Sequence, residues 1–80
     1  MTNPVEAAKL SAPFIDRTNL PDQHPEYGKD HLHQMVLNIP DLVQEGRIEK
    51  AHRWLGWLQC AIVMGGGATL AEMKAINKST

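Results

Sequence analysis

Four histidines, one cysteine and nine carboxylates are the side chains of this 80-residue sequence that could hold a metal ion or carry a proton. His31 and His33 are two positions apart, so on a helix they leave on different sides and do not share a metal ion. His24 and His52 lie far from them along the chain, and no Ser/His/Asp or Cys/His arrangement has a fixed spacing. We therefore expect no metal site, no cofactor and no enzymatic activity.

A run of glycines, Gly65–Gly67, precedes an expected helix start at Thr69. Backbone amides at such a place attract anions, and glycine lets an anion approach closely. A phosphate-binding loop would continue with Lys-Ser/Thr, and a dinucleotide-binding loop would follow a strand; the chain has neither. We interpret the run as a flexible connector and leave anion binding there as an alternative.

A second group of residues suits a nucleotide. Arg53 stands next to Trp54, and the planar guanidinium of arginine binds phosphate through two parallel hydrogen bonds. Tyr27 and Lys29 pair an aromatic ring with a positive charge, and aromatic rings stack on bases. The predicted residues for binding a ligand or a partner are Tyr27, Lys29, Arg53 and Thr69.

Composition narrows the class of protein. The sequence has 42% hydrophobic and 21% charged residues, as expected for one folded globular domain. Its single cysteine excludes an internal disulfide and suits a reducing cytoplasm. We expect neither a signal peptide nor a membrane span, because the apolar run at 61–64 is far shorter than the ~20 residues a span needs. The net charge of −1 disfavours nucleic-acid binding, which needs a basic surface.

The apolar spacing predicts an all-α fold built on an αα-hairpin. The first long helix covers about 30–45 and begins near Pro25–Tyr27 or with Asp30 as its N-cap; Gly46 ends it. Its apolar stripe has steps of three and four residues: Leu32, Met35, Ile39 and Leu42. Because the stripe keeps its phase across Pro40, we predict one helix, kinked near Asn38-Ile39.

The second long helix covers about 47–64, and a short C-terminal helix covers about 69–78. The short helix should start with a capping box made by Thr69 and Glu72. Residues 1–24 contain three prolines and many turn formers, so we predict an extended N-terminal arm that is anchored by apolar side chains, ahead of a helical domain at 25–80. Within this arm, Val5–Leu10 is compatible with a short helix that ends before Pro13. The anchors are Phe14, Ile15 and Leu20.

The second helix carries more apolar surface than one neighbour can cover. One stripe faces the first helix: Ile48, Ala51, Leu55, Leu58 and Ile62. The other stripe holds both tryptophans and consists of Trp54, Trp57, Ala61 and Met64. Gly56 lies beside it and is small enough to let a second helix backbone approach. A chain of 80 residues has few elements to cover this stripe, so we predict a homo-oligomer interface at Trp54, Gly56, Trp57, Ala61 and Met64.

Part of the C-terminal half resembles a motif of small accessory proteins of tailed bacteriophages. The matching residues are Lys50-Ala51-x-Arg53-Trp54-Leu55-Gly56-x-x-Gln59, then Thr69-Leu70-x-Glu72-Met73, and Asn77. Where that motif usually has a glycine after the glutamine, this chain has Cys60. The resemblance implies a phage protein that works in the cytoplasm of its bacterial host by stoichiometric binding.

Three hypotheses about function follow. In the first, the chain oligomerises and inhibits a host defence protein, as anti-CRISPR proteins do. In the second, it sequesters a cyclic nucleotide signal of the host defence. In the third, it is a small helix-turn-helix regulator that binds DNA, although the third helix carries only Lys74 and Lys78 as basic residues.

Overall fold

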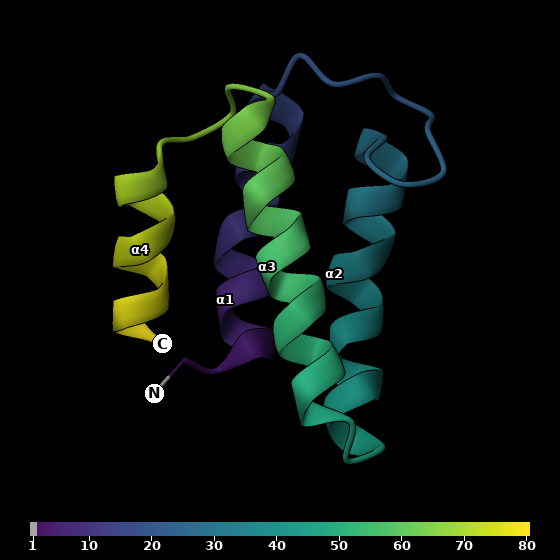
Figure 1. The fold of residues 1–80 in the computed structure, drawn as a ribbon, viewed down its shortest axis with the longest axis vertical. Helices are drawn as coiled ribbons and strands as arrows, with labels where there is room; N and C mark the ends of the chain where they lie inside the picture. Colours follow the sequence, from purple (N-terminus) through teal and green to yellow (C-terminus); the bar gives the residue numbers. More distant parts are fainter. Residues whose placement is uncertain (1) are drawn as a thin grey trace.

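The computed structural model describes residues 2–80, and all regular secondary structure in this range is helical, as the sequence predicts (Figure 1). Two longer helices pack together, and a short helix ends the chain. The elements follow the chain as α1 (Pro4–Ser11), the 3₁₀-helix η1 (Ala12–Arg17), α2 (Lys29–Gln44), α3 (Ile48–Met64) and α4 (Leu70–Ser79).

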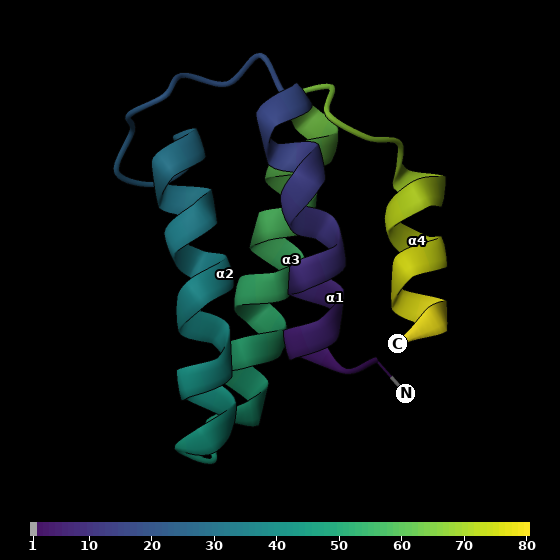
Figure 2. The same cartoon turned by 180° about the vertical axis from the view of Figure 1, so that it is seen from behind.

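Helix α1 lies at the centre of the arrangement and contacts α2, α3 and α4 (Figure 2). Helices α2 and α3 form the expected antiparallel hairpin, and α1 covers it from one side. Helix α4 lies at the edge of the bundle, beside α1. The core therefore forms where α1, α2 and α3 meet, and α4 is added to it from outside.

The N-terminal segment is the main difference from the sequence prediction. Residues 4–17 are helical, so the extended arm is wrong there, while the short helix considered at Val5–Leu10 is confirmed. Asn3 caps α1 by accepting hydrogen bonds from the Val5 and Glu6 amides. The buried face of α1 consists of small side chains, with Ala7, Ala8 and Ser11 fully buried. Small side chains let helix axes approach closely, so this segment packs as a wall of the core despite its prolines.

Helix α2 runs without interruption through Pro40, so the prediction of one helix is confirmed; the kink stays a prediction. All four residues of its stripe are buried: Leu32, Met35, Ile39 and Leu42. The N-cap is Gly28 and not Asp30, which lies inside the first turn. The Lys29 and Asp30 amides donate to the carbonyls of Pro21 and Asp22, so the preceding loop supplies the partners that a capping side chain would have supplied.

Helix α3 buries most of the stripe that was expected to face α2: Ala51, Leu55, Leu58 and Ile62. Ile48 is 43% exposed, because it stands in the first turn beyond the reach of the core. The capping box of α4 is confirmed, with Thr69 accepting from the Glu72 amide and Glu72 accepting from the Thr69 amide. Gly46 ends α2 at φ +78°, as predicted.

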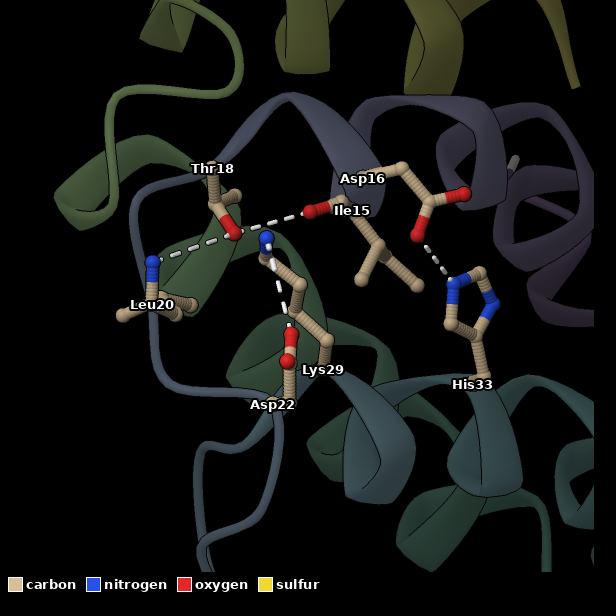
Figure 3. A network of polar contacts seen from close by, with 7 residues as sticks. All are labelled: Ile15, Asp16, Thr18, Leu20, Asp22, Lys29 and His33. Atoms are coloured by element: carbon tan, nitrogen blue, oxygen red, sulfur yellow. Dashed lines mark hydrogen bonds and ion pairs between the residues drawn. The ribbon is translucent and has the colours of Figure 1, made fainter.

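Hydrogen bonds and ion pairs fix both ends of the loop between η1 and α2 (Figure 3). The Thr18 hydroxyl donates to the Ile15 carbonyl at 2.8 Å and accepts from the Leu20 amide at 3.4 Å. Asp16 of η1 lies 2.9 Å from the His33 ring of α2. The predicted anchors lie in the core or against it, with Ile15 fully buried.

The Gly65–Gly67 run is a packed turn, so its interpretation as a flexible connector is wrong. Gly66 has φ +77°, a conformation that favours glycine, and the Gly66 and Gly67 amides donate to the last turn of α3. A Cβ atom on Gly65 would lie 2.7 Å from Leu20 Cγ, and one on Gly67 would lie 2.6 Å from Thr18 Cγ2. The Gly65 amide donates to the Ala61 carbonyl. All three glycine amides therefore have hydrogen-bond partners within the fold and are not free to bind an anion.

Replacing Gly67 with alanine should therefore destabilise the fold. The added methyl group would collide with the Phe14 carbonyl and with Thr18, and such overpacking costs about 1–3 kcal/mol. The measurement is the free energy of unfolding from urea titration. Lys9→Ala is the control: Lys9 is exposed on α1, and a substitution at such a position should change the free energy of unfolding by less than about 0.5 kcal/mol. Equal effects of the two substitutions would contradict the packed turn.

Candidate binding face

The exposed side of α3 carries an apolar surface, which we call the α3 face and define by Gly56, Trp57, Cys60 and Met64. These positions are exposed and recur at helical spacing. Met64 is 80% exposed and Trp57 is 47% exposed. No side chain of the described chain lies within 4 Å of the place where a Cβ of Gly56 would stand. None of these four residues is charged, but Arg53, one turn before Gly56 and Trp57 on the same side of α3, is exposed beside them.

A hollow of about 180 Å³ borders the α3 face on the side of the loop that precedes α2. Its walls include Leu20 and Tyr27 from the loop and Trp57 and Met64 from α3. The Trp57 indole nitrogen donates to the Glu26 carbonyl at 2.8 Å. This bond fixes the loop against α3, so Trp57 both anchors the loop and forms part of the exposed surface.

A second hollow, of about 240 Å³, lies between α3 and α4. Its apolar walls come from Val63 and Met64 of α3 and from Leu70 and Met73 of α4. Met73 is the one residue of α4 that is buried, and Leu70 is 58% exposed. The α3 face is therefore flanked by a hollow on each side.

Three polar side chains set the position of α4. Gln59 and Asn77 form two amide–amide hydrogen bonds of 2.8 and 2.9 Å, which join α3 to α4. The Gln59 amide nitrogen also donates to the Ser11 hydroxyl at 3.1 Å, which adds α1. The Ser11 hydroxyl donates to the Ala7 carbonyl. This cluster, which we call the amide cluster, satisfies its buried groups within the fold.

The ends of the chain strengthen the same attachment. The Asn3 amide donates to the Thr80 carbonyl at 3.1 Å, and the Thr2 hydroxyl donates to the Asn77 carbonyl at 3.1 Å. Figure 1 shows the segment before α1 close to the C-terminal end of α4. Helix α4 is thus held by polar contacts, by the buried Met73 and by Ile76, which packs against the core.

The structure separates the predicted interface residues. Gly56, Trp57 and Met64 lie together on the α3 face. Ala61 is 9% exposed and belongs largely to the core. Trp54 is half-buried against the core, and the Lys50 ammonium lies 5.5 Å from its ring centroid. The interface stays a prediction, now centred on three of its five residues.

The four predicted ligand-binding residues do not form one cluster by themselves. Tyr27 stacks on His24 with ring centroids 3.6 Å apart. Lys29 lies 3.9 Å from Asp22, as drawn in Figure 3. Thr69 is used as the helix cap of α4. Arg53 is exposed on α3, and no ion pair to it is formed within residues 2–80.

Some of the residues that shape this region had no assigned role in the sequence analysis. Gln59 and Asn77 belong to the quoted motif, but a glutamine on a long apolar helix reads equally well as a solvent-facing residue. Their pairing depends on how α4 folds back, and spacing along the sequence carries no signal of it. Ser11 was missed for the same reason, since its helix was expected to be an arm.

Other site types find no support in the described chain. Residues 2–80 contain no group of three His, Cys, Asp or Glu side chains placed to hold a metal ion. None of the helices in that range combines the length and apolar character that crossing a bilayer requires. Searches of protein-family models, curated proteins and solved structures find no match to this chain. The resemblance to phage accessory proteins therefore stays a prediction.

Replacing Gln59 with leucine should loosen α4 before the rest of the fold. The change leaves Asn77 and Ser11 without their partner, and an unsatisfied buried polar group costs about 1–3 kcal/mol. We expect that loss in the free energy of unfolding, and faster amide hydrogen exchange in α4 than in α2 and α3.

The double variant Gln59→Leu/Asn77→Leu is the control, because removing both amides leaves fewer unpaired groups. It should be less destabilised than the sum of the two single variants. Additive effects, or uniform exchange across all helices, would show that the amide cluster does not hold α4.

Proposed function

We propose that this protein is not an enzyme and that it acts by stoichiometric binding, with the α3 face as the surface through which it self-associates. One observation carries the proposal: Met64 and Trp57, two turns apart on the same side of α3, are 80% and 47% exposed. Large contiguous apolar patches are uncommon on monomeric proteins and mark interaction surfaces. Aromatic residues and methionine are enriched in protein–protein interfaces.

Gly56 adds support for a helix as the group that approaches. A glycine inside a helix costs about 0.5–1 kcal/mol relative to alanine. No side chain of the described fold occupies the space above Gly56, so packing within the protomer does not explain it. A second α3 could pack closely against the backbone at Gly56, because glycine leaves this space free. A two-fold axis would place the same face of both copies in the contact.

Self-association should depend on Met64. We expect size-exclusion chromatography with light scattering to report a dimer or larger species for the unchanged chain at micromolar concentration. Met64→Lys should shift it to the monomer, because it places a charge in an apolar contact. Leu37→Lys is the matched control, since Leu37 is 68% exposed on α2 and belongs to neither hollow. A folded monomer at all concentrations would overturn the proposal.

The resemblance to phage proteins supports a host defence protein as the target, so we propose inhibition of bacterial defence as the biological role. The test is the efficiency of plating of a sensitive phage on bacteria that carry a defence system, with and without this protein. Expression should raise plating against at least one CRISPR–Cas or other system in a panel. No increase against any of them would reject this role while leaving the self-association result intact.

A further inference from the structure

We propose that the cleft between α3 and α4 binds a small anionic amphiphile. In this proposal a short, straight hydrocarbon chain lies in the 240 Å³ hollow, and Lys74 and Lys78 bind its anionic head. The cleft shares Gly56, Cys60 and Met64 with the α3 face, so an amphiphile in the cleft and a second copy on that face compete for these residues. The occupant that the inference names is a free small molecule.

The apolar half of the cleft suits a hydrocarbon chain. Val63, Met64, Leu70 and Met73 form most of its walls, and no charged group other than Lys74 reaches it. Methionine side chains are unbranched and adapt to a flexible ligand. The volume lies below the 300–1,000 Å³ that is typical for drug-sized ligands, which favours a short chain.

The polar half continues directly from the apolar half. A neighbouring, more open hollow is lined by Thr2, Lys74, Asn77 and Lys78. Lys74 and Asn77 line both hollows, so the cleft changes from apolar to cationic along α4. A ligand that spans both halves must be apolar at one end and anionic at the other.

The two lysines are available for such a head group. They are four residues apart, so both lie on one side of α4, where like charges repel each other. Neither ammonium lies within 4.0 Å of a carboxylate in residues 2–80. Lys78 also suits the negative end of the α4 dipole, but Lys74 is in the middle of the helix and has no such role. An anion between them would remove the repulsion.

Charge also distinguishes this occupant from a second copy of the chain. The α3 face has no carboxylate, so a second copy that docks with that face would leave both lysines unpaired. The amide cluster holds the cleft open at a set width, because Gln59 and Asn77 line the apolar hollow and bridge its two helices.

The test is a titration of the ¹⁵N-labelled chain with decanoate below its micelle concentration, followed by NMR. We expect saturable shifts at the amides of Val63, Met73, Lys74 and Asn77. Lys74→Gln/Lys78→Gln should weaken binding about tenfold, as expected for loss of a charge-assisted contact. Lys50→Gln, at the far end of α3, is the matched control and should bind decanoate as the unchanged chain does.

Two ligands of the same chain length separate charge recognition from adhesion to an apolar surface. Decanol and decyltrimethylammonium should bind at least tenfold more weakly than decanoate. Equal binding of all three, equal binding by the double lysine variant, or the absence of saturable shifts around the cleft would each overturn the proposal. Lys74 and Lys78 are exposed, so the spectrum of the double variant should otherwise match that of the unchanged chain.

Discussion

The position of α4, and with it the shape of the surface, depends on the buried carboxamide of Gln59. A buried amide must find partners, because an unsatisfied polar group costs more than a made hydrogen bond returns. Gln59 bonds to Ser11 and to both polar atoms of the Asn77 carboxamide, so three helices meet at one side chain. Since α4 buries only Met73, these directional bonds determine where it sits.

The same constraint explains why α1 is central. Two helices that pack side by side leave part of their apolar stripes exposed to water, and a short chain has little other surface to bury. Helix α1 supplies the third wall with small buried residues, and Ser11 on that wall is also the acceptor for Gln59. The loop from η1 to α2 then closes over the end of the bundle, where Gly65 and Gly67 leave room for Thr18 and Leu20.

What these contacts leave uncovered is the apolar side of α3. Trp57 uses its indole nitrogen to hold the loop, while half of its surface stays exposed. Helix α4 stands against α1 (Figure 2). A hollow remains between α4 and α3. The two proposed binding surfaces, the α3 face and the cleft beside α4, thus have one origin: α4 packs beside α1 and leaves this side of α3 uncovered.

The sequence by itself determined the helical elements, because periodicity and capping are local. Residues close together in the sequence specify the apolar stripe of α2, the end of α2 at Gly46 and the capping box at Thr69. Only the tertiary structure decided that residues 4–17 form a wall of the core, that Gly65–Gly67 is a packed turn, and that Gln59 pairs with Asn77. Each of these depends on contacts between segments far apart in the chain. The energy of such contacts comes from burial and bond geometry, which residue spacing does not encode.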